Sequence, residues 1–273
     1  MKKTAALFVI LLVLVSSIAG CSDKKTAPVI SASKNAVLKV GATPLPHAEI
    51  LKVIQPILAR EGVELRIVEF TDYVRPNVAL AEKELDANFF QHIPYLQQFA
   101  TDRGLALTYT ISVHIEPMGI YSKKIKNLTD LPNGSQVAIP NDPTNGGRAL
   151  MLLVQAGLLK MKEGVGVKGT IKDVSDNPKK LVIKELEAPL LPRALEDVAI
   201  AVINSNYALE AGLNPVKDSL FIERKESPYA NVLAVRKGDE KRPEIVKLSK
   251  ALTSPDVKKF IEDKYKGAVV PTF

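Results

Sequence analysis

An arginine stands at the start of an apolar, helix-like run in the stretch NDPTNGGRALMLLVQAGL, residues 141–158. Turn-forming residues fill the positions before it, and the first backbone N–H groups of a helix have no partner within that helix. These groups, together with the partial positive charge of a helix start, favour a bound anion. The residue types therefore raise one question, which is whether the anion is a phosphate or a carboxylate.

The residues after the glycines favour a carboxylate. A Walker-type phosphate loop continues with Lys and then Ser or Thr, whereas here Gly147 is followed by Arg148 and Ala149. The planar guanidinium of Arg148 matches a carboxylate with two parallel hydrogen bonds. Asn141 and Asn145 add amide groups that donate or accept hydrogen bonds. We predict a carboxylate site at this helix start, and a capped helix with an exposed arginine is the alternative.

Aromatic residues crowd a second segment, DANFFQHIPYL at 86–96, which has the form of a strand followed by a helix. Phe89, Phe90 and His92 are candidate binding residues. Because strand side chains alternate between the two faces, only one of the two phenylalanines is expected to reach a site. Tyr73, in FTDYVRPN, stands at the end of another strand. Aromatic walls without strong charge suit an apolar ligand side chain, including a thioether, and core packing is the alternative.

Two polar residues in VHIEP, His114 and Glu116, lie on the same face of a predicted strand. We expect Glu116 to receive a ligand ammonium, and a surface carboxylate is the alternative. His47, His92, His114 and Glu116 also have the chemistry of a zinc or manganese site. The His-rich loop of metal importers is missing, however, and Arg148 would repel a cation, so we predict no metal ligand.

Catalytic motifs are missing from the sequence. It has no GxSxG nucleophile elbow and no HExxH metal motif, and its single cysteine is Cys21. Nothing in the spacing of Ser, His and Asp links them into a triad. We therefore predict a binding protein rather than an enzyme, with no cofactor.

The N-terminus has the organisation of a lipoprotein signal peptide, predicted to cover residues 1–20. Lys2 and Lys3 precede an apolar stretch at 5–15 that is too short to span a bilayer, and IAGC follows. We expect cleavage before Cys21 and attachment of lipids, including palmitate, to that residue. Residues 21–35 are small and polar and predict a lipid-anchored tether. The remaining body is expected in the periplasm or extracytoplasmic space of the cell envelope.

Composition excludes several other classes of protein. The chain has 273 residues and a formal net charge of +7, but its basic and acidic residues are interleaved. A mixed surface of this kind does not predict nucleic-acid binding. The length is sufficient for one large domain or two small ones with their own cores.

Beyond the tether, strand patterns and helix patterns alternate along the chain. Strands are predicted at 37–42, 63–70, 85–89, 105–122 with an interruption at Pro117, 135–140, 180–186, 197–203, 219–223 and 229–236. Helices are predicted at 47–62, 76–83, 94–103, 141–158, 243–253 and 255–265.

This alternation predicts an α/β fold with parallel sheets covered by helices on both faces. Ligands of such sheets bind beyond the carboxyl ends of the strands. Five of the polar and aromatic residues follow predicted strands, namely His47, Tyr73, His92, Asn141 and Asn204. We therefore expect one shared binding site.

Several segments in this order resemble one family, the substrate-binding lipoproteins of methionine ABC importers, also called the NlpA lipoprotein family. The segments are FTDYVRPN, DANFFQHIPYL, VAIPNDPTNGGRAL, LEAPLLPRALED and ESPYAN. With the lipobox, the resemblance extends over nearly the whole chain.

The resemblance implies a two-lobed periplasmic-binding-protein fold of type II, with a ligand cleft between the lobes and two chain crossings near 114–119 and 226–232. Lobe 1 would comprise residues 36–115 plus 230–273, and lobe 2 residues 116–229. The implied ligand-binding residues are Tyr73, Phe89 or Phe90, His92, Glu116, Asn141, Asn145, Arg148, Asn204 and Asn231.

The resemblance also implies the partners. These are L-methionine or a related amino acid or short methionine peptide, an ABC permease with its ATPase, and the membrane through the lipid on Cys21. Some methionine-binding members carry aromatic residues where this chain has His114 and Glu116, whereas others share the PHAEIL segment at 46–51. The exact amino acid therefore stays open, and a divalent-metal-binding lipoprotein and a surface adhesin or chemoreception module remain as alternatives.

Overall fold

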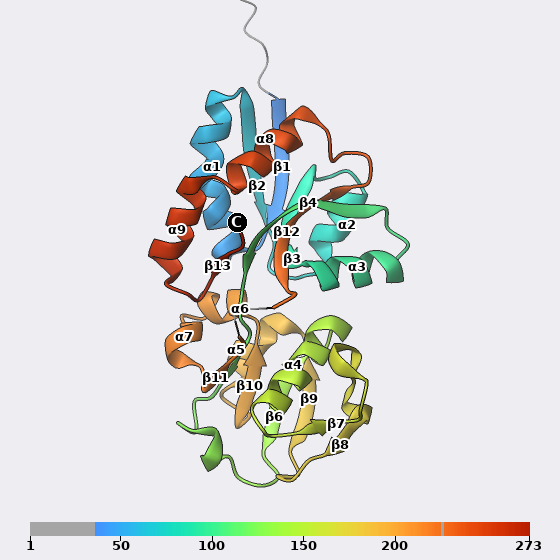
Figure 1. Ribbon diagram of the computed structural model, residues 1–273, viewed down its shortest axis with the longest axis vertical. Coiled ribbons are helices and arrows are strands. Elements are labelled where there is room, and N and C mark those ends of the chain that lie inside the picture. Colours follow the sequence, from blue (N-terminus) through green and yellow to red (C-terminus); the bar gives the residue numbers. More distant parts are fainter. Residues whose placement is uncertain (1–35, 225–226) are drawn as a thin grey trace, which may run out of the picture. The chain divides into compact units, whose positions relative to one another are not determined.

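The computed structural model describes residues 36–224 and 227–273, which form two main β-sheets with helices on their faces (Figure 1). The predicted signal peptide, Cys21 and the tether lie outside the described residues. Within the described ranges, no helix has both the length and the apolar character needed to cross a membrane.

The first sheet has six strands in the order β13-β4-β12-β3-β1-β2. Their bounds are β1 (Ala36–Ala42), β2 (Val63–Glu69), β3 (Ala87–His92), β4 (Leu107–Ile115), β12 (Ala230–Arg236) and β13 (Val270–Pro271). The short strand β13 and the extension of β3 to His92 were not predicted from the sequence.

The expectation of parallel sheets is met only in part, because each sheet combines parallel and antiparallel pairs. In the first, β1 pairs in parallel with β2 and β3, whereas β12 runs antiparallel to both β3 and β4. The physical reason is the path of the chain. Strand β4 leads out of the first sheet and β12 leads back into it, so these two neighbours must run in opposite directions.

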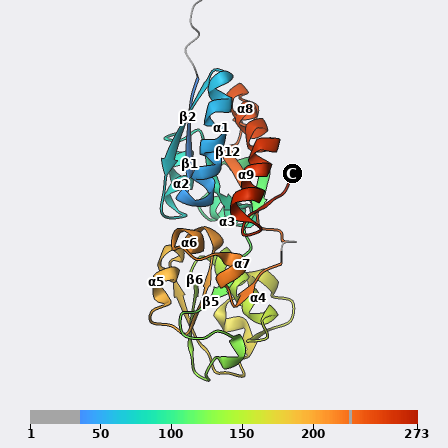
Figure 2. The ribbon, with the colours of Figure 1, turned by 90° about the vertical axis from the view of Figure 1, so that its left-hand side faces the viewer.

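Side-chain alternation along β12 divides the core of the first sheet between its two faces. Leu233 and Val235 pack with helices α1 (Glu49–Arg60), α8 (Pro243–Leu252) and α9 (Pro255–Tyr265), which lie together in Figure 2. Val232 and Ala234 point to the other face, covered by α2 (Arg75–Ala81) and α3 (Ile93–Asp102). The sheet is therefore buried on both sides, as predicted for an α/β fold.

Helix α1 contains Pro56 in its interior without ending there. Ile50, Ile54 and Leu58 form its buried face, as their spacing predicts, and Pro56 is exposed on the opposite face. A proline removes one helical hydrogen bond, and water can satisfy the freed carbonyl on an exposed face.

The second sheet has five strands in the order β11-β5-β10-β6-β9. Their bounds are β5 (Gly119–Tyr121), β6 (Gln136–Pro140), β9 (Val182–Leu186), β10 (Ile200–Ile203) and β11 (Phe221–Ile222). Val137 and Ile139 of β6 pack with helix α4 (Pro143–Gln155), and Ala138 packs with α5 (Leu191–Ala194) and α6 (Ser205–Glu210) on the other face.

Several short elements were not predicted from the sequence, because each is only one turn or one strand pair long. They are η1 (Pro44–Ala48), η2 (Leu128–Asp130), η3 (Gly166–Lys168), η4 (Ile171–Asp173), η5 (Ala188–Leu190), α5, α6, α7 (Pro215–Asp218) and the pair β7 (Lys160–Met161) and β8 (Val174–Asp176).

The chain passes from the first sheet to the second after β4, and it returns between β11 and β12. Residues 116–118 connect β4 to β5, and β12 is the next strand along the chain after β11. The interruption at Pro117 predicted from the sequence therefore coincides with the first passage. Polar residues needed for a site lie beside both passages, because Glu116 is in the first and Asn231 follows the second.

The two glycines at the start of α4 allow close packing of the backbone. A Cβ atom added to Gly147 would lie 2.0 Å from the carbonyl oxygen of Val167 in η3. Gly147 is therefore needed for the close packing of α4 against η3. This role was not predicted from the sequence.

Gly147→Ala is expected to destabilise the protein by about 1–3 kcal/mol, because backbone atoms must move to admit the methyl group. Urea unfolding followed by circular dichroism measures this change. Gln155→Ala, at an exposed position of the same helix, is the matched control and should lie within about 0.5 kcal/mol of the parent. Equal stability of the two variants would contradict the packing argument.

Candidate ligand-binding site

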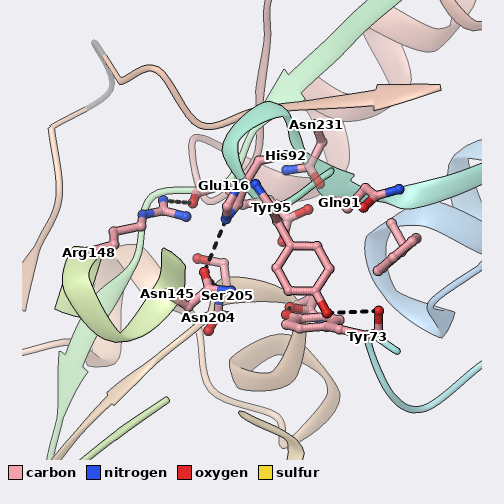
Figure 3. Close-up of a pocket in the computed structure, with 12 residues that line it drawn as sticks. Tyr73, Gln91, His92, Tyr95, Glu116, Asn145, Arg148, Asn204, Ser205 and Asn231 are labelled. Carbon is pink, nitrogen blue, oxygen red and sulfur yellow. Dashed lines mark hydrogen bonds between the residues drawn. The ribbon is translucent and has the colours of Figure 1, made fainter. Parts of the chain in front are cut away.

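A cavity lies between residues from the two sheets, close to both passages of the chain (Figure 3). The cavity is small, with a volume of about 20 Å³. Its lining residues are Tyr73, Phe90, Gln91, His92, Tyr95, Glu116, Asn145, Arg148, Asn204, Ser205, Asn206 and Asn231.

The structure brings eight of the residues named from the sequence into this cavity. They are Tyr73, Phe90, His92, Glu116, Asn145, Arg148, Asn204 and Asn231. They come from both sheets and from segments more than 150 residues apart.

Two of the named residues do not line the cavity. Phe89 is completely buried in the core of the first sheet, because alternation in β3 sends it to the face opposite Phe90. Asn141 is exposed, and its backbone N–H donates to Leu186 at the end of β9. Residue 141 still pairs with the end of β9 as a continuation of β6, and it precedes the start of α4. Its side chain is exposed and does not line the cavity.

Four lining residues were not assigned from the sequence, namely Gln91, Tyr95, Ser205 and Asn206. Tyr95 follows His92 by three residues and lies on the first turn of α3. This spacing could have indicated that the two side chains lie close together. Ser205 and Asn206 begin the one-turn helix α6, whose pattern is too short to predict.

His92 joins the two sheets at the cavity. It is the N-cap of α3, where Nδ1 accepts a hydrogen bond from the backbone N–H of Tyr95 at 3.1 Å. Because Nδ1 accepts, Nε2 carries the proton and donates to Oδ1 of Asn145 in α4, at 3.1 Å. Burial, reinforced by the charge of Arg148, lowers the pKa of His92 to about 3. The imidazole is therefore neutral near pH 7.

The start of α4 is capped by its own carboxylate. Asp142 Oδ1 accepts from the backbone N–H of Asn145 at 2.9 Å, and the Asn145 amide nitrogen also donates to Asp142. The expectation that these helix-start N–H groups bind a ligand carboxylate is therefore wrong for Asn145. The Asp142 side chain already satisfies this donor and complements the helix dipole.

Arg148 is buried and already holds one carboxylate, that of Glu223 after β11. Its Nε and Nη2 donate to the two oxygens of Glu223 at 3.1 and 2.5 Å, and Nη2 also donates to the backbone carbonyl of Glu116 at 2.9 Å. The guanidinium lies 4.0 Å from the ring centre of Tyr229. Glu223 was not identified from the sequence, because only the fold brings it to α4.

The third nitrogen of the Arg148 guanidinium, Nη1, differs from the other two. None of the hydrogen bonds among the described residues uses it. Since Arg148 lines the cavity, an oxygen of a small ligand would find a charged donor there. The pairing with Glu223 also fixes the plane of the guanidinium.

Glu116 is a buried carboxylate that receives a hydrogen bond from His114 and lies at ion-pair distance from His47. His114 Nε2 lies 2.8 Å from Oε1, and His47 Nε2 lies 3.2 Å from the same oxygen. Burial alone would raise the pKa of Glu116, but the two imidazoles hold it far below its usual range. The carboxylate is therefore ionised. These three residues also form the one cluster among the described residues with metal-ligand spacing.

The two acidic residues at the cavity, Glu116 and Glu223, have different partners. Arg148 and Glu223 form a pair, whereas no lysine or arginine of the described chain pairs with Glu116. Burial lowers the pKa of His114 as well as that of His92, so neither supplies a cation near pH 7. Glu116 is therefore a buried carboxylate in the cavity lining without a lysine or arginine partner, which favours a ligand carrying a positive group.

Asn204 adds a neutral acceptor to the cavity. It lies at the end of β10, and its amide nitrogen donates to Asn145 Oδ1 at 2.8 Å. Its Oδ1 is buried and has no hydrogen-bond partner within the described ranges. A buried acceptor without a donor is costly, so a ligand N–H would be favoured here.

Aromatic rings form the other wall. The ring of Tyr73 lies 5.9 Å from that of Phe90 and 5.7 Å from that of Tyr95 between centres. The Tyr73 hydroxyl donates to Asn206 Oδ1 at 2.5 Å, which ties this wall to α6. The Tyr95 hydroxyl donates to the backbone carbonyl of Tyr73 at 3.0 Å (Figure 3). The hydroxyl groups are thereby occupied, and the rings present mostly apolar surface.

The chain matches known proteins over most of its length. The sequence profile described as NlpA lipoprotein matches residues 38–273. The D-methionine-binding lipoprotein MetQ of Escherichia coli (strain K12) is 45% identical over 236 residues, covering 85% of this chain and 87% of that protein.

Solved structures are equally similar. A nutrient-binding protein from Burkholderia cenocepacia bound to methionine has a TM-score of 0.84 and 48% identity, covering 86% of this chain and 100% of that one. An ABC transporter periplasmic substrate-binding protein from Coxiella burnetii has a TM-score of 0.82 and 42% identity, covering 86% of this chain and 99% of that one.

The low pKa of His92 predicts a pH dependence of stability. Below pH 6.5 the imidazole of His92 binds a proton in the unfolded protein but stays neutral in the folded protein. Acidification therefore lowers the free energy of unfolding until the pH reaches about 3. His92→Asn keeps an N-cap acceptor and removes the titration. Between pH 7 and 5 the parent should lose about 2 kcal/mol more than the variant, measured by urea unfolding. Parallel losses would contradict a neutral buried His92.

Proposed function

Because this chain belongs to the NlpA lipoprotein family, we propose that it is the substrate-binding lipoprotein of an ABC importer, with methionine or a closely related amino acid as its ligand. The fold is the two-lobed periplasmic-binding fold of that family. The main observation in favour of the proposal is that one cavity is lined by both an ionised Glu116 and an Arg148 whose Nη1 is not used by other described residues. These groups match the two charged ends of an amino acid.

The ligand carboxylate binds at Arg148 in this proposal. Nε and Nη2 are held by Glu223, so the carboxylate takes Nη1 without displacing that pair. Asn145 does not supply a backbone donor, because Asp142 occupies it. The neutral His92 beside them contributes an oriented ring rather than a second charge.

The ligand ammonium binds at Glu116 and Asn204. The carboxylate provides the charge, and the unpartnered Oδ1 of Asn204 provides a neutral acceptor. Excluding water from such a site strengthens each charged contact. Asn231, beside the second passage of the chain, completes the polar wall.

The ligand side chain packs against Tyr73, Phe90 and Tyr95. Their rings suit an unbranched thioether, which is polarizable and adapts to aromatic surfaces. Relatives with the names of methionine-binding lipoproteins support the same choice.

Delivery to the importer requires the two lobes to open and close around the ligand. We assign residues 36–115 plus 230–273 to lobe 1 and residues 116–229 to lobe 2, in keeping with the strands of each sheet. A permease and its ATPase are the proposed partners, and lipid on Cys21 is the proposed link to the membrane.

Divalent metal binding is the second candidate, favoured by the His47, His114 and Glu116 cluster, whose ligand atoms lie within 4.8 Å of one another. A calorimetric panel of amino acids, methionine peptides, Zn²⁺ and Mn²⁺ separates the two functions. Binding of methionine in the micromolar range or tighter supports the proposal. Tight binding of a metal with no amino-acid binding would overturn it.

Arg148→Ala is expected to weaken methionine binding by roughly a hundredfold to several thousandfold, because breaking a buried charged pair costs about 3–5 kcal/mol. Calorimetry measures the dissociation constant. The matched control is Arg66→Ala, which removes the same charge from an exposed position of β2 and should change affinity by less than about twofold. A loss under about threefold in Arg148→Ala would show that the carboxylate lies elsewhere.

Glu116→Gln is expected to lower the preference for a charged amine. The parent should bind methionine at least tenfold more tightly than its 2-hydroxy analogue, in which a hydroxyl replaces the ammonium, because hydrogen bonds to charged groups contribute about 1.5–3 kcal/mol. In the variant the two affinities should converge. Competition calorimetry provides both constants, and an unchanged ratio would remove Glu116 from the ammonium site.

A further inference from the structure

Two buried histidines, His47 and His114, lie behind Glu116 and do not line the cavity. They are 1% and 0% exposed. A ligand in the cavity therefore does not touch them, and any effect they have on binding must act through Glu116 or its neighbours.

Both histidines approach one oxygen of Glu116. An ionised carboxylate only accepts hydrogen bonds, so His114 Nε2, at 2.8 Å from Oε1, carries a proton and donates it. His47 Nε2 lies 3.2 Å from the same Oε1 and 3.2 Å from Oδ1 of Asn231, its hydrogen-bond partner. None of the hydrogen bonds between described residues reaches Oε2. Since Glu116 lines the cavity, Oε2 is the oxygen left for a ligand.

The imidazole rings are held in place from behind. His47 Nδ1 lies 2.7 Å from the hydroxyl of Thr43, and this contact fixes the ring beside Glu116. Phe89 meets both imidazoles edge to face, with ring centres 4.8 Å from His47 and 5.3 Å from His114. Phe89, named from the sequence as a binding residue, therefore supports the histidines instead.

A neutral donor holds a carboxylate without cancelling its charge. Burial lowers the pKa of His114, and its Nδ1 has no hydrogen-bond partner among the described residues, as expected for a neutral ring. A lysine or arginine in the place of His114 would orient Glu116 equally well, but its positive charge would repel a ligand ammonium. The neutral imidazole of His114 avoids that competition.

We propose that His47 and His114 are positioning residues that hold Oε1 of Glu116, direct Oε2 into the cavity, and so set the preference for ligands with a free ammonium group. The inference rests on the proposed function, because it assigns the ammonium to Glu116. His47 Nε2 also lies 3.2 Å from Oδ1 of Asn231, so it positions a second cavity residue at the same time.

The test compares two ligands across a set of variants. Calorimetry on the purified protein measures dissociation constants for L-methionine and its 2-hydroxy analogue. In His114→Ala, methionine binding should weaken roughly tenfold or more, whereas binding of the analogue should change by less than about threefold. His47→Ala should act in the same direction, with a smaller effect in keeping with its longer contact.

Conservative variants separate positioning from folding. His114→Gln places an amide N–H near the position of Nε2 and should restore most of the selectivity for methionine. His47→Gln serves in the same way. If the alanine variants fail to fold, the glutamine variants provide the test. Full selectivity for methionine in these variants, together with its loss when Glu116→Gln is added, supports a positioning role.

Three results would overturn the inference. An equal loss of affinity for both ligands in the histidine variants would show a purely structural role. Unchanged selectivity in His114→Ala would show that Glu116 needs no support. Stabilisation by Zn²⁺ that disappears in the histidine variants would show that the cluster is a metal site. Failure of the parent itself to bind methionine is seen first, and that result would overturn the proposed function as well.

Discussion

A buried carboxylate with histidine neighbours and no lysine or arginine partner among the described residues is the constraint on which this structure depends. Removing Glu116 from water is unfavourable, and the protein offsets that cost with a hydrogen bond from His114 and the nearby imidazole of His47. Its charge therefore stays available in the cavity. The neighbouring pair of Arg148 and Glu223 is balanced internally, yet leaves Nη1 as a charged donor. One end of the cavity therefore offers a carboxylate, and the other offers a charged hydrogen-bond donor.

The polar groups of the cavity also connect the two sheets. His92 in the first sheet donates to Asn145 at the start of α4, and the Tyr73 hydroxyl donates to Asn206 in α6. Ser205 in α6 donates to the carbonyl of Pro117 in the first passage between the sheets. The first two of these bonds join residues 36–115 to residues 116–229, whereas the third lies within residues 116–229. Ligand binding and lobe position therefore share the same contacts.

Sequence reasoning predicted much of this arrangement where a local pattern specified it. The buried face of α1, the strand break at Pro117 and the approximate bounds of most long elements follow from periodicity and turn residues. Antiparallel β12 was missed because strand direction depends on the path between sheets. Glu223 and the role of Phe89 were missed because each acts through residues far away in the chain.

By itself, the sequence determined the alternation of strands and helices, the membership of the family, and most of the residues that surround the cavity. Those features depend on local periodicity and on sequence motifs, which can be recognised from the sequence alone. Only the tertiary structure decided which of those residues meet, which oxygen of Glu116 is occupied, and which nitrogen of Arg148 remains open. The physical reason is that hydrogen bonds and ion pairs form between atoms within about 3 Å of each other, and only the folded chain brings such distant residues that close.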